Sequence, residues 1–273
     1  MKIFLDSADL DEIREAYSYG IIDGITTNPS LIKKAVEKRI SSNMKTNMSA
    51  YIKEILKIAK GTPVSLEVTE TTEKGMLRQA RKLYKMFNQP YRNVVVKIPV
   101  NPAFNGYENI HFDGLKVIRQ LSKEKIPVNC TLIFTPEQAL LAAKAGAKYV
   151  SPFAGRIDDF IRDNNKIKFE KSDYFPAQGL EKKKEVLNDN GIQSGVELVA
   201  EIAEILSLSG LKTEVLAASI RNPRQARECA IAGADIATLP LKVLKEMVNH
   251  PKTSEGMQKF TKDIVIEYMD LLR

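Results

Sequence analysis

The chain has 273 residues, of which 44% are hydrophobic and 27% charged, with a formal net charge of +7 and a pI near 9.2. This composition is near the globular average and excludes a disordered or collagen-like chain, and no apolar run reaches the roughly 18–20 residues of a membrane-spanning helix. The positive charge is scattered among glutamates without the aromatic and basic pattern of RNA-binding modules, so we expect neither membrane nor nucleic acid as a partner. Small anionic substrates fit this charge.

Eight short apolar or β-branched runs recur along the chain, and segments with helical spacing lie between them. The runs predict strands at residues 3–6, 24–27, 64–68, 94–98, 129–134, 149–153, 214–219 and 235–240. Strands that are apolar throughout and alternate with helices are typical of a parallel sheet buried on both faces. We therefore predict an α/β chain that forms a single (β/α)8 TIM barrel over residues 1–273. A doubly wound sheet is the alternative, although no GxGxxG motif follows an early strand.

The polar side chains of these predicted strands gather at the C-terminal ends, where the catalytic groups of TIM barrels lie. In chain order they are Asp6, Thr26, Thr27, Asn28, Glu67, Lys97, Asn129, Thr131, Ser151 and Ser219. Single members have simpler explanations, since Asp6 could cap a helix and Asn28 could form a turn before Pro29. Because parallel strands direct all these ends to one mouth of the barrel, the set as a whole predicts an active site.

Lys97 is the strongest candidate for a nucleophile, because three valines precede it and Ile98 follows it. Apolar surroundings disfavour the ammonium form and supply the neutral amine that attacks a ketone. The alternatives are a lysine that extends into solvent at the barrel mouth, or an internal ion pair with Glu67. Asp6 and Glu67 supply two carboxylates for proton transfer, and Thr131 is placed to hold a water between Glu67 and the lysine nitrogen.

Basic and hydroxyl side chains follow the sixth and seventh predicted strands. They are Arg156, Ser219 and Arg221, and Arg221 stands beside a predicted helix start. A guanidinium, a hydroxyl and backbone N–H groups at a helix start suit a phosphate group, which TIM barrels often bind after the seventh strand. The alternative for Arg221 is a surface charge next to Asn222 as a helix cap.

Metal, cofactor and triad chemistry are not expected. The two histidines, His111 and His250, are far apart and away from the strand ends, which disfavours a zinc site and a Ser-His-Asp triad. The two cysteines, Cys130 and Cys229, make no disulfide framework and favour a cytoplasmic protein. Acidic residues directly after the first apolar run predict no signal peptide.

Eight segments together resemble the transaldolase family, nearest its small subfamily. In chain order they are IFLDSADLDEI, GITTNPSLI, SLEVT, VVVKIP, NCTLIF, YVSPFAGRIDD, AASIRNPRQ and GADIATLPLKVL. The resemblance implies a class I aldolase barrel of the pentose phosphate pathway that transfers a dihydroxyacetone unit between sugar phosphates through a lysine Schiff base.

The resemblance also implies a role for each matching residue. Lys97 would form the Schiff base, Asp6 would be the acid/base group, and Glu67 and Thr131 would position water. The donor hydroxyls would be held by Thr26, Asn28, Asn129 and Ser151, and the phosphate by Arg156, Ser219 and Arg221. Related fructose 6-phosphate aldolases carry Gln in place of Glu67 and Tyr in place of Phe153, so both identities here favour transfer over cleavage that releases dihydroxyacetone. A non-catalytic basic barrel that binds phosphosugars or nucleic acid is the remaining alternative.

The chain differs from small members of the family by insertions near 101–113 and 162–193 and by an extension near 38–49. The first two follow strands four and six, so we expect them on the active-site face, where Tyr107, His111, Tyr174 or a lysine of residues 182–184 could reach substrate. The alternative is a polar surface loop. An amphipathic helix is predicted near 255–273, and the resemblance implies a homo-oligomer, a pentamer or decamer, in which this helix crosses to a neighbour.

Overall fold

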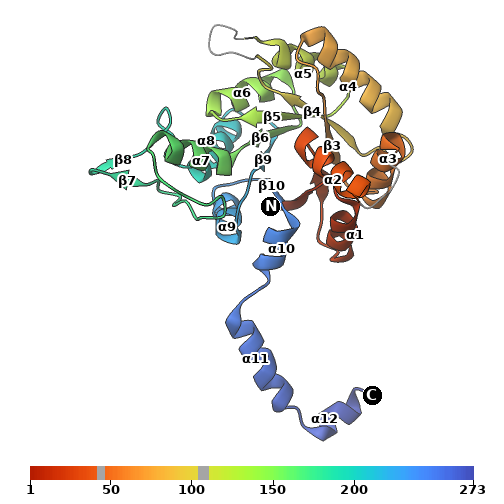
Figure 1. The fold of residues 1–273 in the computed structure, drawn as a ribbon, viewed down its shortest axis with the longest axis vertical. Helices are drawn as coiled ribbons and strands as arrows, with labels where there is room; N and C mark the ends of the chain where they lie inside the picture. Colours follow the sequence, from red (N-terminus) through yellow and green to blue (C-terminus); the bar gives the residue numbers. More distant parts are fainter. Residues whose placement is uncertain (42–46, 104–110) are drawn as a thin grey trace.

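The barrel is the central feature of the computed structural model, which describes residues 1–41, 47–103 and 111–273 (Figure 1). Eight parallel strands close in the order β1-β10-β9-β6-β5-β4-β3-β2. They are β1 (Lys2–Asp6), β2 (Gly24–Thr26), β3 (Val64–Glu67), β4 (Val94–Pro99), β5 (Val128–Ile133), β6 (Tyr149–Pro152), β9 (Glu214–Ala217) and β10 (Ile236–Leu239). Every predicted strand is present, and the predicted (β/α)8 TIM barrel is confirmed.

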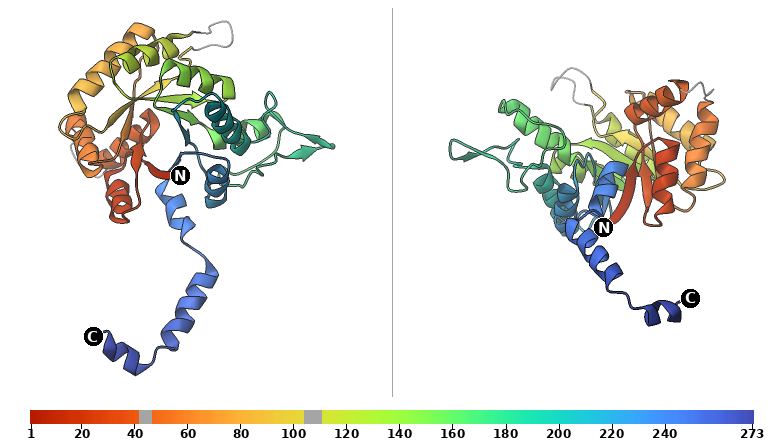
Figure 2. Two further views of the ribbon diagram at one scale, coloured as in Figure 1. Left: turned by 180° about the vertical axis from the view of Figure 1, so that it is seen from behind. Right: turned by 60° about the horizontal axis from the view of Figure 1, so that its bottom comes forward.

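Helices cover the outside of this barrel (Figures 1 and 2). They are α1 (Leu10–Ser18), α2 (Pro29–Ser41), α3 (Met48–Ile58), α4 (Glu73–Phe87), α5 (Asp113–Lys123), α6 (Pro136–Ala145), α7 (Ala154–Asn164), α8 (Gly195–Leu208), α9 (Pro223–Ile231) and α10 (Leu241–Met247). Several begin at a side chain that accepts a hydrogen bond from the first turn, as Thr72, Ser194 and Asn222 do. These caps satisfy N–H groups that have no partner inside the helix.

An apolar cluster fills the interior of the barrel below the strand ends. It includes Phe4, Val95, Tyr149, Leu216 and Ile236, and the rings of Phe4 and Tyr149 meet edge to face with centroids 6.1 Å apart. Side chains alternate between the two faces of a strand, so the residue two positions further along each strand also points inward. In this way the apolar cluster forms the floor on which a polar layer of inward side chains is built.

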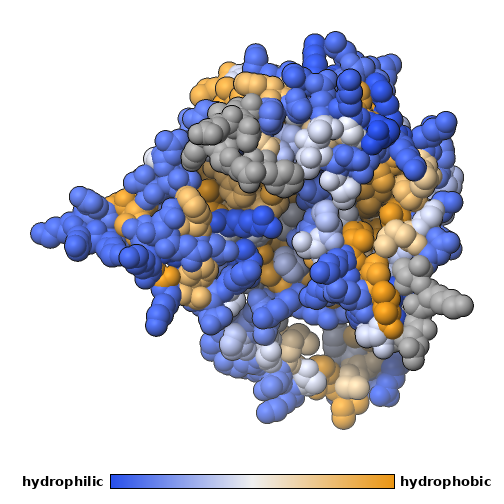
Figure 3. Space-filling model, turned by 45° about the horizontal axis from the view of Figure 1, so that its top comes forward, coloured by the Kyte–Doolittle hydropathy of each residue, from blue (hydrophilic) through white to orange (hydrophobic). Residues whose placement is uncertain are grey.

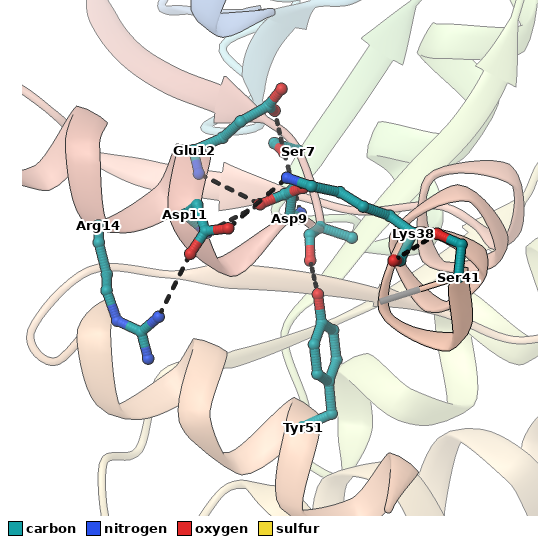
Figure 4. Close-up of polar contacts among 9 residues, drawn as sticks. Ser7, Asp9, Asp11, Glu12, Arg14, Lys38, Ser41 and Tyr51 are labelled. Carbon is teal, nitrogen blue, oxygen red and sulfur yellow. Dashed lines mark hydrogen bonds and ion pairs between the residues drawn. The ribbon is translucent and has the colours of Figure 1, made fainter. Parts of the chain in front are cut away.

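The first three helices are fastened to one another beside the end of β1. Asp9 caps α1, and the Lys38 Nζ on α2 lies 2.6 Å from the Asp9 Oδ2 (Figure 4). Tyr51 on α3 donates a hydrogen bond of 2.7 Å to the carbonyl oxygen of Ala8 (Figure 4). These contacts fix the turn that follows Asp6 and thereby the position of that carboxylate.

The predicted insertion after the sixth strand forms an arm on the side of the barrel. α7 continues to Asn164, so the extra segment starts at residue 165 and ends where α8 begins. It contains the short hairpin of β7 (Glu181–Lys182) and β8 (Glu185–Val186), whose outer end projects away from the barrel with a mostly hydrophilic surface (Figure 3). Part of the other insertion, residues 104–110, lies outside the described residues. The same is true of residues 42–46 in the extension near 38–49.

The C-terminal segment extends away from the barrel (Figures 1 and 2). It forms two helices, α11 (Pro251–Lys262) and α12 (Ile266–Leu271), where the sequence predicted one. The β-branched residues Ile264 and Val265 lie at the break, and such side chains lose rotamers in a helix. Neither helix buries a residue. Across the described part of the chain, no helix is long and apolar enough to cross a membrane.

Candidate active site

The C-terminal mouth of the barrel holds a cavity of about 390 Å³. Nine of the twelve predicted site residues line it, namely Asp6, Thr26, Asn28, Lys97, Ser151, Phe153, Arg156, Ser219 and Arg221. The other three, Glu67, Asn129 and Thr131, lie on β3 and β5, the strands on either side of β4. The structure therefore places residues from seven of the eight strand units at one mouth of the barrel.

Lys97 lies in the wall of this cavity and is 5% exposed. Its Nζ is 3.1 Å from the Glu67 Oε2, and it donates a hydrogen bond of 3.3 Å to the carbonyl oxygen of Thr27. The alternative of a lysine that extends into solvent is wrong, whereas the ion pair with Glu67 is present. The register pairs Glu67 with Lys97 on adjacent strands, so the carboxylate and the amine lie side by side at the barrel mouth.

Asp6 faces the same cavity from the end of β1. Thr26 donates a hydrogen bond of 2.7 Å to the Asp6 Oδ1, and Thr26 is itself 2.6 Å from the Thr238 hydroxyl. Desolvation raises the pKa of the Asp6 carboxyl above its usual value, against the lowering effect of the Thr26 hydrogen bond and of the Lys97 charge. A raised pKa suits a carboxyl that takes up and returns a proton during one reaction cycle.

Polar side chains on β3, β5 and β6 form a buried chain behind the lysine. Ser151 donates a hydrogen bond of 2.7 Å to the Asn129 Oδ1, and Asn129 donates one of 3.2 Å to the Ser65 hydroxyl. Ser151 also lines the cavity. These bonds hold the amide in one orientation, because its oxygen accepts on one side while its nitrogen donates on the other.

Thr131 is fully buried on β5, and its hydroxyl has no hydrogen-bond partner among the described residues. A buried hydroxyl without a partner is costly, so such a group is normally satisfied by water or ligand. β5 adjoins β4, the strand of Lys97, so this buried hydroxyl lies one strand away from the lysine. Asn28 has two functions, since its Oδ1 accepts the N–H of Leu31 at 2.9 Å to cap α2 while the residue also lines the cavity.

The predicted phosphate-binding residues follow two neighbouring strands of the barrel, β6 and β9. Arg156 stacks over the Phe153 ring, with its guanidinium carbon 4.9 Å from the ring centre. Arg221 is held by Asp159, whose Oδ2 is 2.8 Å from an Arg221 Nη2. Ser219 adopts a left-handed backbone with φ of 62°, an unfavourable conformation for a residue other than glycine. Strained backbone of this kind is concentrated at functional sites.

Comparison with known proteins assigns the chain to a family. A sequence model of the Transaldolase/Fructose-6-phosphate aldolase family matches residues 3–270. The chain belongs to this family. It is 41% identical over 263 residues to a protein of Thermoplasma volcanium named "Probable transaldolase", covering 96% of this chain and 95% of the relative. A "Probable transaldolase" of Caldicellulosiruptor saccharolyticus is 43% identical over 264 residues, covering 96% of each chain.

Solved structures show the likeness at the level of the fold. A lactate oxidase from Pediococcus acidilactici superposes with a TM-score of 0.50 at 13% identity, covering 88% of this chain and 62% of that chain. The barrel is thus shared far beyond the Transaldolase/Fructose-6-phosphate aldolase family, whereas the long sequence matches make the chain an enzyme of the transaldolase type. The resemblance noted from the sequence is confirmed.

The two residues whose identities the resemblance links to transfer, Glu67 and Phe153, lie beside Lys97. The Glu67 carboxylate forms the ion pair described above, and the Phe153 ring centre is 5.9 Å from the Lys97 Nζ. A phenylalanine offers no hydroxyl that could donate a proton there. The site therefore has the residues expected for transfer at both positions.

Several cavity residues were missed by sequence reasoning. They are Thr238 on β10, Lys242 at the start of α10, and Lys171 and Ser172 in the inserted arm. Thr238 could have been found, because it stands two residues after the inward Ile236 and strand side chains alternate. No pattern in the sequence pointed to Lys171 or Ser172.

Other residues suggested for the insertions lie elsewhere. Tyr174 donates its hydroxyl to Glu228 on α9 at 2.8 Å, away from the cavity. The lysines of residues 182–184 belong to the exposed β7–β8 hairpin, His111 is an exposed residue before α5, and Tyr107 lies outside the described residues. Within the described ranges, no group of three or more His, Cys, Asp or Glu side chains is arranged to hold a metal ion.

Proposed function

We propose that this chain transfers a dihydroxyacetone unit from fructose 6-phosphate or sedoheptulose 7-phosphate to erythrose 4-phosphate or glyceraldehyde 3-phosphate. The observation that carries the proposal is the buried Lys97 amine, 3.1 Å from Glu67, in one cavity with Asp6 and three phosphate-binding candidates. This reaction would place the enzyme in the non-oxidative pentose phosphate pathway of the cytoplasm.

The first step would be formation of a Schiff base. Neutral Lys97 attacks the ketone carbon, protons shift to the carbonyl oxygen, and water leaves to give an iminium. Glu67 accepts the lysine proton at the start, and a water near Thr131 and Glu67 serves the later hydrolysis. The donor hydroxyls would be held by Thr26, Asn28, Asn129 and Ser151.

Asp6 would then move the proton that breaks the carbon–carbon bond. Its carboxylate takes the proton of the C4 hydroxyl, the C3–C4 bond breaks, and the electron pair moves to the iminium to form an enamine. The aldose phosphate leaves, and the enamine carbon attacks the carbonyl carbon of the incoming aldose phosphate. Asp6 returns its proton to the new alkoxide, and water releases the product ketose and Lys97.

The test is covalent trapping. Incubation with fructose 6-phosphate and borohydride should attach a reduced three-carbon unit to Lys97, detected by peptide mass spectrometry. Lys97→Met should gain no mass, whereas Lys116→Met, which removes a half-exposed lysine on α5, should label like the unmodified enzyme. Absence of the adduct from the unmodified enzyme would overturn the Schiff-base proposal.

The acceptor distinguishes transfer from cleavage. With erythrose 4-phosphate present, the enzyme should form sedoheptulose 7-phosphate, and without an acceptor free dihydroxyacetone should remain near background. Phe153 supports this expectation, because the position beside Lys97 carries no phenol. Accumulation of dihydroxyacetone at the transfer rate would instead assign fructose 6-phosphate aldolase activity.

We also propose that the enzyme is a homo-oligomer, a pentamer or decamer, joined through its C-terminal helices. α11 and α12 bury nothing in the single chain and expose Phe260, Ile266, Tyr268 and Leu271. Such a patch is typical of an interaction surface. Light scattering should give a mass of five or ten chains, and removal of residues 251–273 should lower it; an unchanged mass would contradict this role of the tail.

A further inference from the structure

We propose that Lys171 and Ser172, in the inserted arm between α7 and α8, bind the phosphate group of the sugar substrate together with Arg156 and Arg221. The inference rests on the proposed function. It adds to the phosphate-binding site two residues from a segment outside the (β/α)8 units. Its starting point is the cavity wall, which Lys171 and Ser172 share with Arg156, Ser219 and Arg221.

The two residues occupy the tip of a well-defined turn. The N–H of Asp173 donates a hydrogen bond of 2.9 Å to the carbonyl oxygen of Glu170, which closes a β-turn with Lys171 and Ser172 in its centre. The Asp173 carboxylate accepts the N–H of Glu170 at 2.8 Å and braces the turn from the other side. The turn thus presents a cation and a hydroxyl side by side at the cavity.

A buried arginine fastens this turn to the barrel. Arg162 on α7 is 4% exposed, and one guanidinium nitrogen donates to the carbonyl oxygens of Asp173 at 3.2 Å and Tyr174 at 2.9 Å. The guanidinium carbon also lies 4.9 Å from the ring centres of both Phe169 and Phe175. Planar donors combined with aromatic stacking are what arginine provides and lysine does not.

A second attachment joins the same turn to α9. Tyr174 donates its hydroxyl to Glu228, and the Arg224 guanidinium carbon lies 3.7 Å from the Tyr174 ring centre. α7 and α9 are the helices that begin directly after the strands carrying the phosphate-binding candidates. The arm is therefore fixed to the same two elements that position Arg156 and Arg221, so its tip is pre-organised relative to them.

The charges of the cavity show which ligand suits this tip. Five cations line the cavity, namely Lys97, Arg156, Lys171, Arg221 and Lys242, against one carboxylate, Asp6. Lys97 and Arg221 have acidic partners in Glu67 and Asp159, and Lys242 lies 3.8 Å from Glu246. Lys171 forms no ion pair with any described residue. An unpaired lysine and a hydroxyl beside two arginines provide the donors that a phosphate dianion requires.

This contact should make the enzyme discriminate between phosphorylated and nonphosphorylated sugars. A phosphate bound by Lys171 lies at the far end of the substrate from the reacting carbonyl at Lys97, so its loss should weaken binding of phosphorylated sugars and leave the chemical step unchanged. Nonphosphorylated fructose makes no such contact. The arm then favours phosphorylated substrates over free sugars.

The test compares Lys171→Ala and Ser172→Ala with Lys183→Ala, a matched exposed lysine at the hairpin tip of the same arm. Lys171→Ala should raise the KM for fructose 6-phosphate about tenfold with little change in kcat, and Ser172→Ala severalfold, as expected for hydrogen bonds to a charged group. Lys171→Arg should restore most of the affinity. Unchanged KM values for Lys171→Ala, or an equal rise for Lys183→Ala, would overturn the assignment.

A binding measurement separates this inference from the reaction itself. Inorganic phosphate is titrated by calorimetry into unmodified enzyme, Lys171→Ala and Lys183→Ala. Weaker phosphate binding by Lys171→Ala alone supports the phosphate contact even where the unmodified enzyme transfers no dihydroxyacetone, a result that refutes only the proposed function. Equal phosphate affinity for all three proteins refutes the contact even where transfer is active.

Discussion

Gln225 and Asp158 form a buried hydrogen bond of 2.7 Å that supports the phosphate wall from behind. The same Gln225 side chain accepts the backbone N–H of Arg221 at 2.8 Å, so one amide connects a carboxyl group on α7 to the loop between β9 and α9. The other Asp158 oxygen accepts the N–H of Gly195 at the start of α8. Three helices thereby fix the backbone from which Arg221 extends.

Gln225→Ala should therefore weaken phosphate binding, although the Gln225 side chain does not itself contact the substrate. Loss of the bond to the Arg221 N–H lets the loop shift, and small displacements of positioning groups lower kcat/KM by about ten- to hundredfold. The matched control is Gln138→Ala on α6, which removes a comparable bond of 2.8 Å to the N–H of Phe134. Steady-state kinetics with fructose 6-phosphate should show the larger loss for Gln225→Ala, and equal losses would contradict a positioning role.

Asp6→Asn should separate Schiff-base formation from cleavage. Lys97 and Glu67 remain, so the ketose still forms an iminium, but no carboxylate takes the C4 proton, and the rate of transfer should fall by about 10²–10⁴-fold. Borohydride should then trap the whole six-carbon sugar phosphate on Lys97 rather than the three-carbon unit. Asp23→Asn, which alters the carboxylate bonded to Ile3 N–H at the other end of β1, should transfer normally.

Thr26→Val should move the acid limb of the pH–rate profile for transfer to higher pH. The pKa of Asp6 is already raised by desolvation, and the Thr26 hydrogen bond opposes that rise. Transfer needs the ionised carboxylate, so the rate falls as pH drops through this pKa; without the hydrogen bond the pKa rises further and the fall begins at higher pH. Thr27→Val, which removes a hydroxyl bonded to the Ser65 carbonyl oxygen, is the control, and an identical limb in both variants would exclude the coupling.

The sequence alone was sufficient to predict the barrel and most of the residues at its C-terminal mouth. Apolar runs located all eight strands, and the rule that catalytic groups follow parallel strands selected Asp6, Lys97 and Arg221. Side chains two positions apart on a strand point to the same face. Applied strictly, this alternation also predicts that Thr238 and Ser65 point inward, since each stands two residues from another inward side chain. What it could not supply was orientation, for example that Asn28 uses its oxygen to cap α2.

The inserted arm could not have been placed from the sequence. Lys171 reaches the cavity only because Arg162 stacks between Phe169 and Phe175 and binds the carbonyl oxygens of the turn. Such contacts are tertiary, and they leave neither the period of a strand nor that of a helix in the chain. A lysine of residues 182–184 was one of the residues expected to reach substrate, yet these lysines are exposed and do not line the cavity.

Asp158 predicts a pH dependence of stability. Desolvation raises the pKa of this buried carboxyl to about 7, while the Gly195 N–H and Arg162 act in the opposite direction. Between the unfolded pKa near 4 and about 7 the folded state binds more protons, so the free energy of unfolding should decrease as pH rises, by about 2–4 kcal/mol in all.

Urea unfolding at pH 5 and pH 8 measures this contribution. The unmodified enzyme should lose more stability between the two pH values than Asp158→Asn, which has no carboxyl to ionise. The asparagine variant starts less stable, because its amide nitrogen presents a second donor to Gln225, so only the change with pH is compared. An equal change in both proteins would mean that Asp158 is already ionised at pH 5.

Gly155→Ala should disturb the phosphate wall directly. A Cβ on Gly155 would lie 2.2 Å from the Ser219 carbonyl oxygen and 2.6 Å from the Arg221 Nε, and a backbone oxygen moves less easily than the end of a flexible side chain. Overpacking of this kind costs about 1–3 kcal/mol, and here the displaced groups are phosphate ligands. Gly256→Ala on α11, where no atom lies within 4 Å, is the control. Gly155→Ala should lower the unfolding temperature and raise the KM for fructose 6-phosphate. Gly256→Ala should do neither, because alanine is the better helix former at that position. A normal KM in a destabilised Gly155→Ala would remove Ser219 and Arg221 from the phosphate site.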